Sequence, residues 1–493
     1  MKSPPNILWI QTDEQRPDSL GCYGSDWART PNIDSLAASG VTMLNAFCQA
    51  PICSPSRMSQ LAGRYPAELN ALSNLGADRK PREGVPEVLP PKTVTFPEIL
   101  ARAGYSTTTI GKTHTPRHEQ TWQRDTRITI FRNDASYTDL GAAHDPEACR
   151  IVQRPGGHPI IIGGSYPEGC KHPTAEVTDQ SIAFLEVKGR EKPFLLRISY
   201  NSPHTPVMPP APFDQTYDNT DIPVRLFSRA AYETRSRWDR AIADRDRMDM
   251  LSAEQQRQAW YDYMSLAAYV DHEVGRVLDS LDRTGLRENT IVLFSSDHGR
   301  ALGEWGAGEK CMFDDQVWRV PFIWNFPQKI PAASRRDDLC ELRDTGRTLL
   351  ALTGLTENIP KTFGGRDLFS DTPPPNAVFG QIGWPELRTP ILTKEELSSY
   401  EKSMHGIPVY NSELRLAVRT DRYRLDVGWM ANGERIADQD GNLFDLQTDP
   451  HETINVWDDE NFVDTRTELL GMLQQHYQEL KLDPRLLRAD KTE

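Results

Sequence analysis

The chain has 493 residues, of which 26% are charged and 38% hydrophobic, and its formal net charge is −14. This composition predicts a globular protein with a sizeable core, and the negative charge argues against nucleic acid as the main partner. No apolar run approaches the roughly 18 residues of a membrane span. The apolar run after Asn6 is also too short for a signal-peptide core, so we expect a cytoplasmic protein that does not bind membranes.

Seven cysteines are scattered along the chain, with no Cys-x-x-Cys pair among them. An odd number at irregular spacing fits neither a disulfide framework nor a cysteine-rich zinc cluster. A single cysteine is usually a buried apolar residue, although one at the start of a helix can be a low-pKa redox group. Both interpretations stay open for Cys53 when it is considered alone.

Apolar strand patterns alternate with helical patterns over about the first 370 residues. Strands are predicted at 6–11, 41–47, 105–110, 193–200 and 291–294, and helices at 31–40, 96–104, 175–187 and 260–285. This alternation predicts an α/β domain in which helices flank a large, mostly parallel sheet. Sheets of this kind bind ligands at the carboxyl ends of their strands.

A proline-rich segment ending at Pro375 predicts a domain boundary. Beyond it, the pattern predicts antiparallel strands over 414–427 and 442–446, a helix through Leu473, and a tail after Leu482. We therefore expect a large catalytic α/β domain over 1–375 and a smaller α+β domain with an antiparallel sheet over 376–493. Within the large domain we expect an irregular insertion at about 115–172 and a charged lid at about 205–255, with the lid charges facing solvent.

The segment Cys53-Ser54-Pro55-Ser56-Arg57 lies at the predicted start of a helix that ends at Gly63. Ser54 is a suitable N-cap and Pro55 a suitable first helical residue. Cys53 would then lie beside free backbone N–H groups, where the helix dipole favours an anion. Arg57 adds a fixed positive charge near the same face.

Four other polar segments each follow an apolar run directly, so they are expected to meet at one edge of the sheet. They contain Asp13 and Glu14, Lys112 and His114, His204, and Asp297 and His298. Carboxylates with one imidazole suit a hard divalent cation. The sequence therefore predicts a metal site built from the two acidic segments.

The cysteine segment resembles the signature of type I sulfatases in the alkaline phosphatase superfamily, near the arylsulfatase, choline sulfatase and phosphonate monoester hydrolase branches. The resemblance is dense over 6–115 and 193–325, and moderate over 442–452. It implies an alkaline-phosphatase-like fold and hydrolysis of a small anionic sulfate monoester to an alcohol or phenol plus sulfate. It also implies that Cys53 is oxidised to formylglycine by a formylglycine-generating enzyme acting on the unfolded chain.

The resemblance further implies a divalent metal, with Ca²⁺ expected first and Mn²⁺ or Mg²⁺ as alternatives. Its ligands would be Asp13, Glu14, Cys53 as formylglycine, Asp297 and His298. Glu14 departs from the Asp or Gln that the family usually has at this position. Asp297 would also help to deprotonate the nucleophilic hydroxyl group of the formylglycine hydrate.

The remaining implied roles concern the sulfate and its leaving group. Arg57, Lys112 and Lys310, which lies thirteen residues after Asp297, would stabilise the sulfate oxygens. His204 would protonate the leaving oxygen, and His114 would take the proton of the second hydroxyl group of the hydrate. Lys112, His204, Lys310 and Asn74 would form the substrate-binding set, although Asn74 is equally well explained as a turn residue.

Two other functions stay open. One is a phosphonate monoester or phosphate diester hydrolase on the same scaffold, and the other is a non-catalytic anion-binding protein. Phosphonate hydrolases of the family have Tyr and Thr where this chain has Lys112 and His114, which favours sulfate. Candidates for recognising the alcohol are Arg117, His118, Arg124 and His405. A homo-oligomer is expected from the resemblance.

Overall fold

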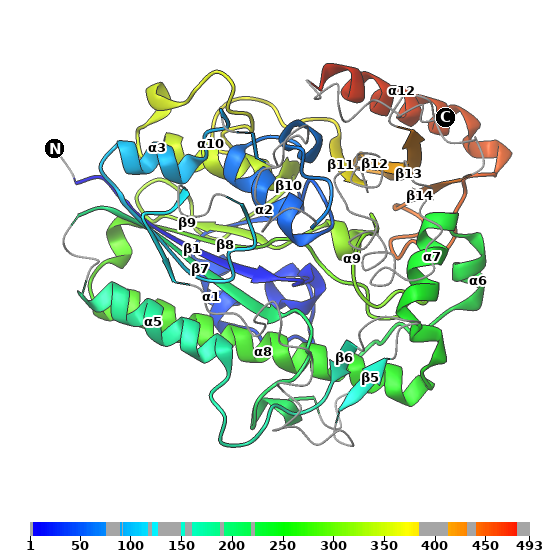
Figure 1. The fold of residues 1–493 in the computed structure, drawn as a ribbon, viewed down its shortest axis with the longest axis horizontal. Coiled ribbons are helices and arrows are strands. Elements are labelled where there is room, and N and C mark those ends of the chain that lie inside the picture. The colour runs from blue at the N-terminus through cyan, green and yellow to red at the C-terminus, as the bar shows by residue number, and fades with distance from the viewer. Residues whose placement is uncertain are drawn as a thin grey trace, which may run out of the picture.

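The structure is a computed structural model. It describes residues 3–74, 89–90, 92–116, 121–126, 149–152, 160–187, 192–217, 222–383, 413–430 and 440–480. Figure 1 shows a central sheet between two helical layers, with a second, smaller sheet at one side. Among these residues, no helix combines the length and apolar character needed to cross a membrane.

The large sheet has eight strands, and most neighbouring strands are parallel. In spatial order they are β10 (Ser334–Glu341), β2 (Val41–Phe47), β9 (Phe322–Asn325), β8 (Thr290–Ser296), β1 (Asn6–Asp13), β7 (Phe194–Pro203), β3 (Ser106–Gly111) and β4 (Arg124–Thr126). Only β9 runs against its neighbours, β2 and β8. The predicted large, mostly parallel sheet is confirmed.

Two apolar cores lie on opposite faces of this sheet because successive strand residues point to opposite sides. Ile7 and Trp9 of β1 belong to one core, while Leu8 and Ile10 belong to the other. The first core includes side chains of α2 (Cys53–Ala62), α3 (Phe96–Arg102) and α10 (Thr345–Leu352). The second includes side chains of α1 (Pro31–Ala38), α5 (Pro173–Val187) and α8 (Ala253–Arg283). Figure 1 shows these two sets of helices above and below the sheet.

The smaller sheet is antiparallel, as predicted. Its strands are β11 (Val378–Gly383), β12 (Glu413–Arg419), β13 (Tyr423–Met430) and β14 (Gly441–Asp445). The helix α12 (Val463–Glu479) packs its apolar side on this sheet through Leu469 and Leu473. The fold class expected from the sequence is therefore confirmed, whereas the exact domain boundary near 375 stays a prediction.

The insertion predicted at 115–172 falls partly outside the described residues. Its described part contains β4, which extends the large sheet, and a separate pair formed by β5 (Arg150–Val152) and β6 (Ile160–Gly163). The predicted tail after Leu482 lies outside the described residues.

The predicted lid contains α6 (Arg229–Thr234) and α7 (Arg237–Asp246), and its charges do not all face solvent. Among the described lid residues, four charged side chains are buried, and they are Arg235, Asp239, Arg245 and Asp246. Arg235 forms an ion pair with Asp314, next to α9 (Asp315–Trp318), at 2.6 Å, and Asp239 accepts a hydrogen bond from Asn442 of β14 at 2.9 Å. The expectation that these charges face solvent was wrong: distant segments supply the partners of Arg235, Asp239 and Asp246, and Arg245 pairs with the adjacent Asp246.

Candidate active site

Four adjacent parallel strands, in the order β8, β1, β7 and β3, carry the polar segments identified in the sequence. Asp13 is the last residue of β1, Asp297 follows β8, His204 follows β7, and Lys112 follows β3. Because the carboxyl ends of these strands lie side by side, segments up to about 280 residues apart meet at one edge of the sheet. The structure brings these segments together at one edge of the sheet, as expected from the sequence.

Cys53 is the first residue of α2, which begins two residues earlier than expected. The prediction that Ser54 caps the helix is wrong, because Ile52 occupies the N-cap position and provides no side-chain cap. Asn74 takes over this task, since its Oδ1 accepts a hydrogen bond from the Ser54 N–H at 2.9 Å. The substrate-binding role of Asn74 stays a prediction.

The Cys53 sulfur is surrounded by positive and potentially metal-ligating groups. Its Sγ lies 3.3 Å from His298 Nε2, 3.4 Å from Lys310 Nζ and 3.9 Å from Lys112 Nζ. Burial alone would raise the pKa of this thiol, but Lys112, Lys310 and His298 lower it well below its ordinary value. The position therefore stabilises an anion.

Arg57 joins the two carboxylates that face Cys53. Its guanidinium contacts Asp13 Oδ2 at 2.6 Å and Asp297 Oδ2 at 2.7 Å, and all three side chains are fully buried. Lys112 Nζ adds a contact of 2.7 Å to the same Asp13 oxygen. Burial would raise the pKa of Asp13, but Lys112 and Arg57 hold it below its ordinary range. For Asp297, burial outweighs Arg57 and raises the pKa to about 6.

The other oxygen of each carboxylate lies on the side of Cys53 and His298. Asp13 Oδ1 is 3.8 Å from the Cys53 sulfur, and Asp297 Oδ1 is 3.8 Å from His298 Nε2. His298 Nδ1 lies 2.8 Å from the Gly299 carbonyl oxygen, so Nδ1–H donates there, and in the neutral imidazole the Nε2 lone pair faces the same space. The ligand atoms of Asp13, Cys53, Asp297 and His298 all lie within 4.8 Å of one another, and this donor set fits a divalent cation.

Glu14 lies beside this group, with a positive φ of 63° that turns its side chain towards other partners. It forms ion pairs with Lys310 and, at 2.5 Å, with Arg300. It also groups with Asp13 and His204 as a second set of donor atoms within 4.8 Å of one another. Its role as a metal ligand stays a prediction.

Two histidines complete the pocket. His204 Nε2 lies 3.0 Å from Lys310 Nζ, and its Nδ1 lies 2.6 Å from the Thr205 carbonyl oxygen. His114 contacts the Cys53 side chain, and burial lowers the pKa of His114 more than this contact raises it. A neutral imidazole therefore lies against the cysteine, and a second imidazole lies beside the lysine.

Two buried residues that were not predicted from the sequence, Arg300 and Gln11, support this site. Arg300 directly follows the Asp297-His298-Gly299 motif, and that adjacency was the available signal. Gln11 accepts hydrogen bonds from Arg57 at 3.4 Å and from the buried Arg197 at 2.6 Å. Its signal was the two-residue period of the strand, which puts it on the same face as Asp13.

The expected alcohol-binding residues are not brought into this cluster by the described structure. Arg124 is exposed on β4, the edge strand of the large sheet. Arg117, His118 and His405 lie outside the described residues. Their roles stay predictions.

Residues 5–355 match the family model described as Sulfatase. The human iduronate 2-sulfatase is 30% identical over 396 residues, which cover 73% of this chain and 68% of that protein. An arylsulfatase of Clostridium perfringens is 26% identical, with 93% of this chain and 91% of that protein covered. The phosphonate monoester hydrolase SpPMH from Silicibacter pomeroyi shares the fold with a TM-score of 0.73 at 22% identity, covering 96% and 95% of the two chains. The chain therefore belongs to the sulfatase family and is a sulfuric ester hydrolase.

Proposed function

We propose that this enzyme hydrolyses a small anionic sulfate monoester with a formylglycine derived from Cys53 and one divalent metal ion, Ca²⁺ first. The observation that carries the proposal is the close grouping of Cys53 with Asp13, Asp297 and His298 under a ring of buried cations. Asp13, Asp297 and His298 would hold the metal, and Glu14 would contribute if its carboxylate turned towards it. When present, the formylglycine hydrate supplies a nucleophilic oxygen, and the metal supplies Lewis-acid stabilisation of the sulfate.

Lys112 and Lys310 are the residues that bind the sulfate oxygens. Both ammonium groups lie within 3.9 Å of the Cys53 sulfur, and each is also paired with a buried carboxylate, Asp13 or Glu14. These pairings fix the two cations in place before substrate arrives, so little reorganisation is needed as charge develops. Arg57 contributes by neutralising and orienting the two carboxylates.

His204 is the proton donor for the leaving oxygen. Because its Nδ1 is hydrogen-bonded to the Thr205 carbonyl oxygen, Nε2 is the nitrogen that can exchange a proton with substrate. Its side chain is 16% exposed whereas that of Glu14 beside it is fully buried, so His204 lies on the solvent side of the cluster, from which the alcohol would leave. His114 is the proton acceptor at residue 53, since its lowered pKa favours the neutral form.

Mass spectrometry and turnover test the nucleophile together. Protein co-expressed with a formylglycine-generating enzyme should carry the aldehyde at residue 53 and hydrolyse an aryl sulfate. Cys53→Ala should lose nearly all turnover, whereas Cys170→Ser, at an exposed cysteine, should keep it. Full activity with an unconverted Cys53 would refute the proposal.

Matched aryl sulfate and aryl phosphonate substrates test the reaction class. We expect a higher kcat/KM for the sulfate because Lys112 and His114 lie against the nucleophile position. A phosphonate preference above about 100-fold, or about 2.7 kcal/mol of transition-state binding, would overturn this order. Chelation followed by addition of Ca²⁺, Mn²⁺ or Mg²⁺ would identify the metal. The homo-oligomer and the cytoplasmic location stay predictions.

A further inference from the structure

With Cys53 as a thiol, the pocket holds a different set of donors from the one that the converted enzyme would use. The set contains one sulfur, one imidazole nitrogen and two carboxylate oxygens, from Cys53, His298, Asp13 and Asp297. All four residues are at most 1% exposed. A cysteine–histidine–carboxylate set in a closed, buried position is the chemistry of a zinc site rather than of a calcium site.

The spacing of these donors also fits zinc. Bond lengths of about 2.3 Å to sulfur and about 2.0–2.2 Å to nitrogen and oxygen give a tetrahedron with edges of roughly 3.4–3.6 Å. The Cys53 sulfur lies 3.3 Å from His298 Nε2 and 3.8 Å from Asp13 Oδ1. Asp297 Oδ1 lies 3.8 Å from His298 Nε2. The two edges from sulfur lie within about 0.3 Å of the tetrahedral value of about 3.6 Å, and the nitrogen–oxygen edge is about 0.4 Å longer than its value of about 3.4 Å.

Hydrogen bonds with neighbouring groups that are not ligands hold these donor atoms in orientations suited to a metal ion. Arg57 holds the Oδ2 atoms of Asp13 and Asp297, which leaves their Oδ1 atoms on the side of Cys53 and His298. The Gly299 carbonyl oxygen fixes the tautomer of His298. Outer contacts of this kind orient metal ligands and raise affinity.

We propose that the unconverted protein binds Zn²⁺ through Cys53, His298, Asp13 and Asp297. On binding, the sulfur–zinc bond forms with the thiolate and the nitrogen–zinc bond with neutral His298, and any proton that Cys53 or His298 carries in the metal-free protein is released to solvent. Arg57 and Lys112 already pair with the two carboxylates, and Lys310 pairs with Glu14, so the zinc ion adds positive charge beside the thiolate. Replacing the sulfur by oxygen removes the soft ligand, so the chemical state of residue 53 sets which class of metal the pocket prefers.

Co²⁺ added to metal-free protein expressed without the generating enzyme provides the test. We expect a thiolate-to-cobalt charge-transfer band that stoichiometric Zn²⁺ abolishes. Cys53→Ser should lose the band and bind Zn²⁺ about 100-fold more weakly or worse, since loss of an outer contact alone costs about 10- to 100-fold. Cys170→Ser is the matched control, because it removes an exposed thiol and should keep both the band and the affinity.

His298→Gln is a second variant, in which the band should persist but the Zn²⁺ affinity should fall. Circular dichroism and urea unfolding would show that each variant is folded. A wild-type protein with no charge-transfer band, or a band that survives in Cys53→Ser, would overturn the proposal. The test uses only the unconverted protein and measures binding. A negative result would therefore leave the proposed sulfatase chemistry untouched. Failure to convert Cys53 would likewise leave the zinc-binding test unaffected.

Discussion

Arg57→Met isolates the electrostatic role of the guanidinium that joins the two buried carboxylates. The substitution keeps a long apolar side chain in α2, so it removes charge and hydrogen bonds with little loss of volume. In the wild type, Arg57 contacts Asp13 at 2.6 Å and Asp297 at 2.7 Å, with no solvent exposure on any of the three side chains. In metal-free protein the variant leaves both carboxylates buried without this partner.

The expected cost follows from what each carboxylate retains. Asp13 keeps Lys112 at 2.7 Å, whereas the remaining ion-pair contact of Asp297 among the described residues is with His298 Nε2, at 3.8 Å. Removing one partner of a buried ion pair destabilises a protein by about 3–5 kcal/mol. Because Asp13 retains Lys112, we expect the lower end of this range, about 3 kcal/mol.

Urea unfolding at pH 7 with chelator present measures this cost. Arg64→Met is the matched control, because Arg64 follows the same helix and its pair with Glu68, at 3.1 Å, is partly exposed. That pair should contribute no more than about 1 kcal/mol. A divalent metal should also stabilise Arg57→Met more than the wild type, since the ion replaces the missing positive charge. If Arg57→Met and Arg64→Met lose the same free energy of unfolding in chelator, the reasoning is refuted.

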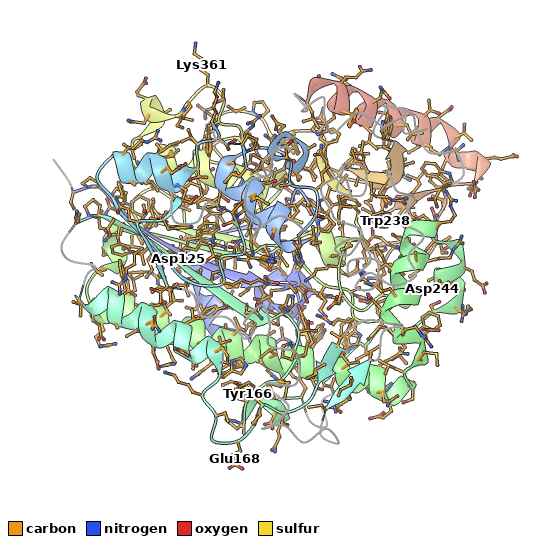
Figure 2. All side chains as sticks on the ribbon, viewed as in Figure 1. Asp125, Tyr166, Glu168, Trp238, Asp244 and Lys361 are labelled. Atoms are coloured by element: carbon orange, nitrogen blue, oxygen red, sulfur yellow. The ribbon has the colours of Figure 1, made fainter. Side chains whose placement is uncertain are left out.

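Three further predictions concern the lid, the small sheet and the metal. Burial and the neighbouring Asp314 raise the pKa of Glu452 to about 8 against the effect of Arg424, so the folded state binds the proton more tightly than the unfolded chain. The free energy of unfolding should therefore fall as the pH rises from about 5 to about 8. Glu452→Gln should flatten this pH profile of urea unfolding. Asp246 accepts a hydrogen bond at 2.9 Å from the N–H of Gly308, in the loop that leads to Lys310. Asp246→Ala should therefore lower kcat/KM about 10-fold or more. Asp244→Ala, on the exposed side of α7 (Figure 2), should leave kcat/KM unchanged. Unchanged kcat/KM in Asp246→Ala would show that the loop does not depend on this bond. Chelation should abolish turnover reversibly, and steady-state assays after exhaustive dialysis would reveal any metal-independent activity.

The sequence by itself was sufficient for the architecture and for the place of the site. Apolar runs such as Ile7–Ile10 alternate with helical patterns, and this alternation determines a mostly parallel sheet between helices. Asp13, Lys112, His204 and Asp297 each follow such a run. Because parallel strands end at a common edge, local patterns alone predicted that these residues would meet.

Only the tertiary structure decided how the charges are partnered. Asp239 lies in the lid whose charges were expected to face solvent, yet it is buried and accepts a hydrogen bond from Asn442, and Glu452 pairs with Arg424 in the interior. The sequence likewise predicted that Ser54 would cap α2, whereas Asn74 does so from a separate segment. Whether a polar group is solvated or buried depends on residues far away in the chain, so no local pattern could have revealed these contacts.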